Sequence, residues 1–193
     1  MNSMKLEKEL SDHTRILQQT VLECSQVINQ IAGDLVECFR RGNKVMLCGN
    51  GGSAADSQHM VAEFVNRFRI DRAALPALAL TVDTSVLTAI GNDSSYEFTF
   101  SRQLQALGRP GDILAAISTS GASANILKAL DVARESGIKR IGFTGEKGRL
   151  TMAPKCDVCL VVPSADTPRV QEVHEFVWHV ICGMVEDELF GHA

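Results

Sequence analysis

Five short apolar runs, each closed by a turn signal, set the strongest limit on how this chain of 193 residues folds. The stretches between them mostly have the periodicity of helices. Strands that are apolar almost throughout and alternate with helices are typical of a parallel sheet covered on both faces. The sequence therefore predicts an α/β fold, a three-layer αβα sandwich around five parallel strands. The runs are KVMLCG (44–49), ALALTV (77–82), DILAAIS (112–118), KRIGFTG (139–145) and DVCLVVP (157–163).

Residues 4–41 precede the first run and have the pattern of one or two amphipathic helices. Apolar side chains recur there at spacings of three and four, and Gly42-Asn43 then stops the helix. We expect this segment either to cover one face of the sheet or to pack against another subunit. The chain is thus predicted to be a single domain, 1–193, with an N-terminal helical oligomerisation segment (4–41) and an α/β core (44–193).

Composition excludes several classes of protein. A net charge of −4 argues against a protein that coats DNA or RNA, and one Trp and one Tyr are too few for base stacking. No segment approaches the roughly 18 apolar residues that span a bilayer. The charged start, MNSMKLEKEL, has no signal-peptide core. We therefore expect a cytoplasmic protein with no nucleic-acid or membrane partner and with reduced cysteines. Cys156 and Cys159 are expected to be buried structural thiols on opposite faces of a strand.

A glycine-rich loop, Gly49-Asn50-Gly51-Gly52-Ser53-Ala54, follows the first run. Its glycines permit a tight turn and let backbone N–H groups approach a ligand at the start of the next helix. The loop also matches a loose dinucleotide fingerprint, with Asp83 in the place of a ribose-binding acid. A dehydrogenase, however, usually needs a second domain for its substrate, and this chain has no room for one.

A hydroxyl-rich loop, Ser118-Thr119-Ser120-Gly121-Ala122-Ser123, follows the third run and precedes an expected helix over 123–136. Hydroxyls and backbone N–H groups at a helix start can hold a phosphate without a lysine. A helix-capping serine would explain one or two of these hydroxyls, but not four. The loop therefore predicts a phosphate site. The missing Walker lysine gives no support to nucleotide hydrolysis.

His59 and Glu63 are four residues apart on one face of the helix that follows the glycine loop. The last helix carries Gln171, Glu172, His174, Glu175 and His179. Spacing alone fits a surface pair better than a ligand pair, and the two nearby ligand loops strengthen the case for a metal or catalytic site. Gln171 and His179 are separated by a rise of about 12 Å, so one ion reaches both only from between them or with help from another subunit. His174 is interpreted as a structural or interface histidine.

Taken together, four segments resemble the SIS-domain family of phosphosugar isomerases and, within it, the phosphoheptose isomerases. The likeness runs from the N-terminal helices to the end of the chain. It implies the SIS fold with flavodoxin-like strand order. It also implies a ketose–aldose isomerase that converts sedoheptulose 7-phosphate into D-glycero-D-manno-heptose 7-phosphate through an enediol, the first step towards heptose precursors such as those of lipopolysaccharide. The segments are GNGGSAADSQH (49–59) with Glu63, TAIGND (88–93), AISTSGASANI (116–126) and TPRVQEVHEFVWH (167–179).

The resemblance also implies roles for individual residues. Glu63 would be the catalytic base and His179 its acid–base partner, and one zinc ion per subunit would be held by His59, Glu63, Gln171 and His179. Members of the family are homotetramers with active sites between subunits, which is the expectation here. The implied substrate-binding residues are Asn50, Gly51, Gly52, Ser53, His59, Glu63, Arg67, Asn92, Asp93, Ser118, Thr119, Ser120, Ser123 and Gln171.

Two non-enzymatic alternatives use the same fold. One is a tetrameric adaptor that binds the bacterial replication initiator protein, and the other is a regulatory sugar-phosphate sensor. Neither needs groups that transfer protons, so Glu63 and His179 favour the enzyme.

Overall fold

The computed structural model describes residues 3–191, and a five-stranded sheet forms its centre. Neighbouring strands are parallel, in the order β2-β1-β3-β4-β5. Each predicted run contains a strand, so the parallel sheet and its flavodoxin-like order are confirmed. The second strand is shorter than its run, because only 3 residues pair with a neighbour. The strands are β1 (Val45–Cys48), β2 (Ala77–Ala79), β3 (Ile113–Ser118), β4 (Lys139–Gly145) and β5 (Val158–Val162).

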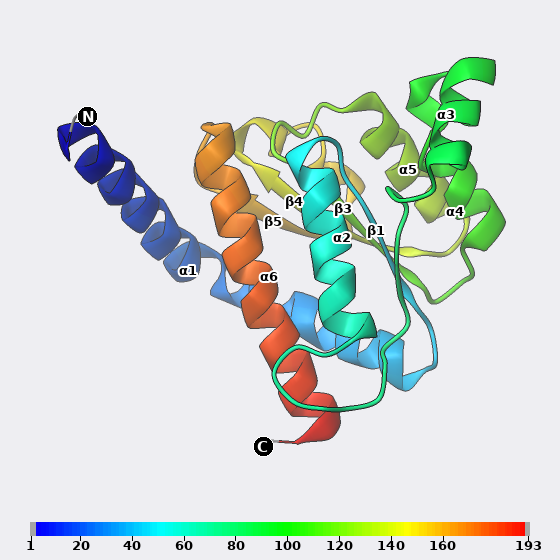
Figure 1. Cartoon of the computed structure of the whole chain (residues 1–193), viewed down its shortest axis with the longest axis horizontal. Coiled ribbons are helices and arrows are strands. Elements are labelled where there is room, and N and C mark those ends of the chain that lie inside the picture. The colour runs from blue at the N-terminus through cyan, green and yellow to red at the C-terminus, as the bar shows by residue number, and fades with distance from the viewer. Residues whose placement is uncertain (1–2, 192–193) are drawn as a thin grey trace.

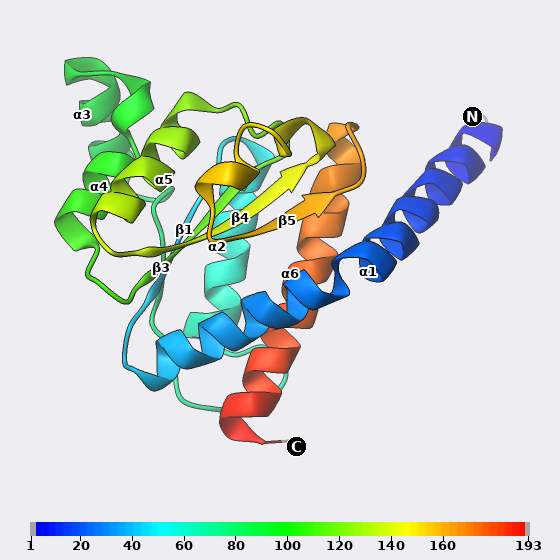
Figure 2. The same ribbon diagram turned by 180° about the vertical axis from the view of Figure 1, so that it is seen from behind.

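Helices cover both faces of the sheet, because its side chains alternate between two apolar cores. In β1, Val45 and Leu47 belong to one core, and Met46 and Cys48 belong to the other. Helices α1, α2 and α6 contribute to the first core, and α4 and α5 to the second, as Figures 1 and 2 show from opposite sides. The three-layer sandwich is confirmed. The helices are α1 (Ser3–Arg40), α2 (Gly52–Val65), α3 (Thr84–Asp93), α4 (Ser101–Leu107), α5 (Ala124–Glu135) and α6 (Thr167–Phe190).

The N-terminal segment is one helix of 38 residues, and its two halves have different surroundings. The C-terminal half packs on α6 and β5 and buries Ile31 and Leu35. The N-terminal half extends away from the body of the molecule (Figures 1 and 2). There Met4, Leu6 and Leu10 are 66–70% exposed. The expectation that this segment covers a sheet face is confirmed for the C-terminal half, and its packing against another subunit stays a prediction.

An aromatic cluster joins α2 and α6 to the sheet. The ring of Trp178, on α6, lies edge-on to Phe64 of α2 at 5.6 Å and to Phe143 of β4 at 5.4 Å. All three side chains are at most 1% exposed. Large rings packed in this geometry contribute more than their buried area alone. The cluster therefore fixes the position of α2 relative to α6.

The cysteines are all free thiols, as expected. The expectation that Cys156 and Cys159 point to opposite faces of a strand is wrong. Cys156 lies just before β5, and a Cβ built on Gly142 would be 2.5 Å from its sulfur and 2.8 Å from that of Cys159. Both thiols are half-buried, and the hydrogen bond with Cys156, together with burial, raises the pKa of Cys159. Within residues 3–191, no helix is long and apolar enough to cross a membrane.

The aromatic cluster leads to a prediction about stability. Replacing Trp178 by Ala leaves a cavity between α2, α6 and β4, so we expect the free energy of unfolding in urea to fall by about 3–5 kcal/mol. The control is Leu150→Ala, which removes a side chain that is 87% exposed and is expected to change stability by less than about 0.5 kcal/mol. Equal effects of the two substitutions would contradict the central role of the cluster.

Candidate active site

Two helices that lie side by side, α2 and α6, carry most of the expected site (Figure 1). Helix α2 follows β1 and helix α6 follows β5, so both begin at the carboxyl edge of the parallel sheet. From that edge they run back along one face of the sheet. Residues of the two helices therefore meet in the order of the sequence. Gln171 contacts Gly52 near the edge, and His179 meets His59 further along.

Three of the four expected metal ligands come together in one chain. The candidate ligand atoms of His59, Glu63 and His179 all lie within 4.8 Å of one another. His59 Nε2 is 3.1 Å from Glu63 Oε1, and the rings of His59 and His179 are 5.0 Å apart. Two imidazoles and a carboxylate that leave a position open are typical of catalytic zinc sites.

Gln171, the fourth expected ligand, lies nearer the sheet edge. Its Nε2 donates a hydrogen bond of 3.0 Å to Asp56 Oδ1, and its amide packs against the backbone of Gly52. Asp56 belongs to the quoted motif but was not predicted as a site residue. The sequence contained one signal for it: Asp56 precedes His59 by three residues and therefore lies on a similar face of α2.

Phe68 is a second residue that sequence reasoning missed. Its ring stacks on His179 at 5.8 Å with an angle of 14° between the planes. The loop that carries it is held by Glu186, which accepts hydrogen bonds from the N–H groups of Phe68, Arg69 and Ile70 and from Arg72 Nε. Such a long-range contact leaves no pattern in the sequence. The expected substrate residue Arg67 is exposed in the same loop.

Burial acts to raise the pKa of Glu186, but the backbone N–H groups and Arg72 outweigh it, and the pKa is lowered. Arg72 also donates to the carbonyl oxygens of Glu63 and Phe64, both at 2.7 Å. The buried ion pair thus joins the end of α2, the loop and α6. It holds Phe68 in place beside His179.

The glycine loop is connected to the start of α5. Asn50 and Asn125 exchange two amide hydrogen bonds of 2.9 Å, and the hydroxyl of Tyr96 donates to Asn50 Oδ1 at 2.9 Å. Gly51 has a φ of +57°, a conformation that favours glycine, directly before α2 begins. Ser53 is buried in the first turn of α2. The side chain of Asn50 therefore orders the loop in this structure, beside its expected role in substrate binding.

The hydroxyl-rich loop lies next to the glycine loop, because β1 and β3 are neighbours in the sheet. Ser118 Oγ accepts from the N–H of Gly121 at 3.1 Å and lies 3.3 Å from Ser123 Oγ. Thr119 and Ser120 are partly or fully exposed, and α5 begins directly after Ser123. Hydroxyls and the first N–H groups of α5 therefore gather at one edge, as a phosphate site requires.

Asn92 and Asp93 lie on α3, apart from the cluster of His59, Glu63 and His179. They end α3, where Asn92 Nδ2 donates to Asp93 Oδ1 at 2.7 Å and both are exposed. None of residues 84–93 is fully buried, and Leu87 packs only in part against the second core. Figure 1 shows α3 on the far side of the molecule from α6. One chain alone does not bring these two side chains to His59 and His179.

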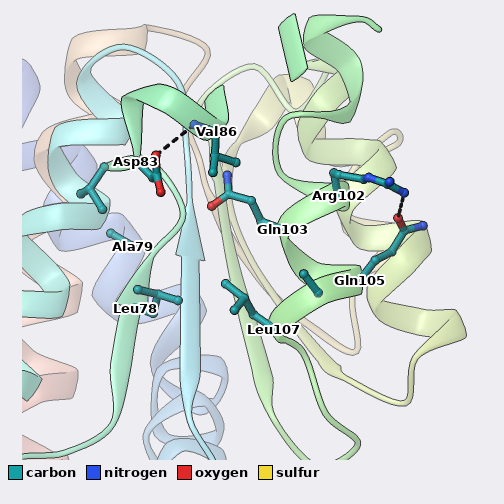
Figure 3. Close-up of a pocket in the computed structure, with 10 residues that line it drawn as sticks. Leu78, Ala79, Asp83, Val86, Arg102, Gln103, Gln105 and Leu107 are labelled. Atoms are coloured by element: carbon teal, nitrogen blue, oxygen red, sulfur yellow. Dashed lines mark hydrogen bonds between the residues drawn. The ribbon is translucent and has the colours of Figure 1, made fainter. Parts of the chain in front are cut away.

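A pocket of about 650 Å³ lies beside the edge strand β2, between β2, α3 and α4 (Figure 3). Its lining is mainly apolar and includes Leu78, Val86 and Leu107, and it contains none of the expected site residues. Asp83, at its rim, accepts a hydrogen bond of 2.9 Å from the N–H of Val86 and caps α3. Asp83, the residue that the dinucleotide fingerprint would assign to ribose binding, therefore has a structural role as a helix cap.

His174 lies in the core, as its structural interpretation predicts. It is fully buried, with Nε2 at 3.4 Å from the carbonyl oxygen of Thr144 and its ring edge-on to Phe143 at 5.8 Å. Burial lowers the pKa of His174 to about 4. The imidazole is therefore neutral near pH 7.

Comparisons with known proteins show the family and the fold of this chain. The family model described as "SIS domain" matches residues 10–145. Phosphoheptose isomerase from Aneurinibacillus thermoaerophilus is 55% identical over 168 residues, which cover 87% of this chain and 84% of that protein. The same enzyme from Trichlorobacter lovleyi is 50% identical over 184 residues, 95% of this chain and 93% of that protein. The structure of phosphoheptose isomerase from Neisseria gonorrhoeae superposes with a TM-score of 0.90 at 38% identity and covers 96% of this chain and 98% of that one.

The buried imidazole of His174 predicts a loss of stability in acid. The unfolded chain takes up the proton near the ordinary pKa of 6.5, and the folded protein only near 4. The unfolded state therefore binds more protons between these values, and stability falls as the pH falls through this range. The stabilising effect is complete above pH 6.5 and is on the order of 3 kcal/mol.

Urea unfolding of the wild type and His174→Gln between pH 7.5 and 4.5 measures this effect. The variant is expected to have a flatter pH dependence. The control is Val173→Ala, which removes a buried side chain of the same helix without a titratable group, and should keep the wild-type slope. An unchanged slope in His174→Gln would refute the prediction.

Proposed function

The chain belongs to the SIS-domain family and, within it, to the phosphoheptose isomerases, and we infer that it converts sedoheptulose 7-phosphate into D-glycero-D-manno-heptose 7-phosphate. It is an isomerase of the aldose–ketose type. The observation within the chain that carries this function is the cluster of His59, Glu63 and His179. We assign the reaction a place at the start of heptose precursor synthesis.

The reaction moves a proton between C1 and C2 through an enediol and needs groups that accept and return protons. We assign the base to Glu63, which takes the proton from C1 of the ketose and delivers it to C2. Glu63 contacts His59 through Oε1, and its carboxylate is the group that we assign to this transfer. His179 is assigned the proton exchange at the sugar oxygens. The ring of Phe68 keeps the imidazole of His179 in position.

We also propose that the cluster holds one zinc ion. Two imidazoles and a carboxylate suit this metal, and Gln171 could supply a further oxygen. A zinc ion held there would polarise the sugar carbonyl and would stabilise developing negative charge. The residues that hold it also keep the substrate oriented along α2 and α6.

The phosphate of the substrate is proposed to bind at the sheet edge, in the loops at 49–53 and 118–123. His59 lies seven residues beyond Gly52, a rise of about 10 Å along α2. The proton-transfer groups are therefore well separated from the phosphate loops. This separation favours a long sugar phosphate whose reacting carbons are at the opposite end from its phosphate.

We further propose a cytoplasmic homotetramer with active sites between subunits. Two observations support the assembly: exposed apolar side chains on the N-terminal half of α1, and the separation of α3, which carries Asn92 and Asp93, from α6. Free thiols at all six cysteines suit a reducing compartment. The adaptor and sensor alternatives are not favoured, because relatives at 50% identity or more are phosphoheptose isomerases.

The role of Glu63 predicts the result of a conservative substitution. Glu63→Gln keeps the shape of the side chain but cannot accept the proton, so kcat should fall by about 10²–10⁴-fold while the sugar phosphate still binds. Turnover of sedoheptulose 7-phosphate and binding by calorimetry measure the two properties. The control is Glu172→Gln, because Glu172 bonds His13 and Arg169 and lies outside the cluster. A near-normal kcat in Glu63→Gln would exclude Glu63 as the base.

The zinc proposal is tested by metal removal. Dialysis against a chelator should abolish turnover of the wild type, and added zinc should restore it. The zinc content per chain, measured by atomic absorption, should fall in His59→Ala and stay unchanged in Glu172→Gln. If the wild type forms no aldose with or without zinc, the isomerase proposal itself fails.

Assembly through α1 predicts sensitivity to charge on its exposed face. Leu6→Asp with Leu10→Asp should reduce the mass measured by light scattering from that of a tetramer to that of a smaller species. The buried half of α1 is untouched, so the circular dichroism of the chain should be retained. A wild type that is a stable monomer, or a double variant with unchanged mass, would contradict the assembly.

A further inference from the structure

We propose that Asp56 is a positioning residue, which holds the amide of Gln171 so that its oxygen is presented to the ligand. This inference rests on the proposed function, in which Gln171 binds the metal or the sugar. Nothing in the conversion of the sugar requires Asp56 to touch the substrate. Its effect would pass through Gln171.

The burial of Asp56 is the first observation. The residue is 3% exposed in α2, three residues before His59 and seven before Glu63. Its Oδ1 accepts the hydrogen bond from Gln171, and its Oδ2 is buried with no hydrogen-bond partner in the described chain. A buried carboxylate with so few partners is costly to a fold. The position of Asp56 beside the site gives a functional reason for a carboxylate at this buried position.

The orientation of Gln171 is the second observation. Nε2 is the atom of the amide that faces Asp56, because it donates the hydrogen bond to Asp56 Oδ1. The oxygen Oε1 is then left for another partner, and cations and sugar hydroxyls both bind to such an oxygen. A Cβ built on Gly52 would lie 2.5 Å from Nε2 and 2.6 Å from Oε1, so the amide rests directly on the glycine. Gln171 is thus confined between Gly52 and Asp56.

The surrounding charges suggest a competing explanation. Burial raises the pKa of Asp56, and the hydrogen bond from Gln171 opposes this. The charge of Glu175 and a hydrogen bond between the two carboxyl groups raise the pKa further, whereas the charge of His59 lowers it. The carboxylate of Glu175 is also 3.9 Å from His59 Nδ1. The two acids could therefore act only through their negative charge, by attracting a cation. Groups behind metal ligands commonly act by orienting them instead, and their loss costs about 10–100-fold in affinity or activity.

A double-mutant cycle separates these explanations. Asp56→Ala, Gln171→Ala and the combined variant are compared in two measurements. The kcat and KM are measured with zinc bound, and the affinity for zinc is measured by adding it to the metal-free protein. If Asp56 acts through Gln171, each single change lowers zinc affinity or kcat/KM by about 10–100-fold. The combined variant is then no worse than Gln171→Ala, because both changes remove the same contact. Asp56→Asn keeps an oxygen that can accept from Nε2 and should retain most of the activity.

Two controls accompany the cycle. Ser57→Ala changes a fully buried polar residue of α2 that bonds the carbonyl oxygen of Ser53, and should leave zinc affinity unchanged. Glu175→Gln removes the neighbouring negative charge without touching Gln171. The inference would be overturned if the losses of zinc affinity or kcat/KM in the two single variants multiplied in the combined variant. Equal losses in Asp56→Asn, Asp56→Ala and Glu175→Gln would overturn it as well.

A crystal structure of Asp56→Ala gives a readout that does not depend on activity. The amide of Gln171 should leave its position on Gly52, and an unmoved amide would overturn the inference. A displaced amide in a protein whose wild type does not isomerise sedoheptulose 7-phosphate would support the role of Asp56 and refute only the proposed function.

Discussion

The packing of Trp178 against Phe64 and Phe143 is the interaction on which the site depends. It fixes α2 and α6 to the same face of the sheet, and both helices begin at the carboxyl edge because the sheet is parallel. Their side chains therefore meet in sequence order. Without this register, His59 and Glu63 would not face His179, although each lies on the correct side of its own helix.

Buried polar groups then refine the positions of the site residues. The ion pair of Glu186 and Arg72 holds the loop in which Phe68 stacks on His179. Asp56 accepts a hydrogen bond from Gln171 at the other end of the site. Each of these contacts joins residues more than a hundred positions apart in the sequence. Apolar residues could fill the same volumes but could not orient a donor or an acceptor.

The site divides into two parts with different chemistry. The loops at the sheet edge offer hydroxyls and helix-start N–H groups, which suit a phosphate in a protein with a net charge of −4. The helices offer imidazoles and a carboxylate, which suit proton transfer and a divalent metal. The two parts are separated along α2, so the fold suits a substrate long enough to reach from the phosphate loops to the imidazoles.

The sequence by itself determined the strands, the two ligand loops and the residue types of the site, because periodicity, glycines and motif spacing are local properties of the chain. The strand order was implied only by the resemblance to the SIS-domain family. Only the tertiary structure placed Asp56 behind Gln171, Phe68 on His179 and the two thiols of Cys156 and Cys159 side by side. It also placed Asn92 and Asp93 away from the cluster. These arrangements depend on how helices and loops pack across the sheet, and packing joins residues whose separation along the chain carries no pattern.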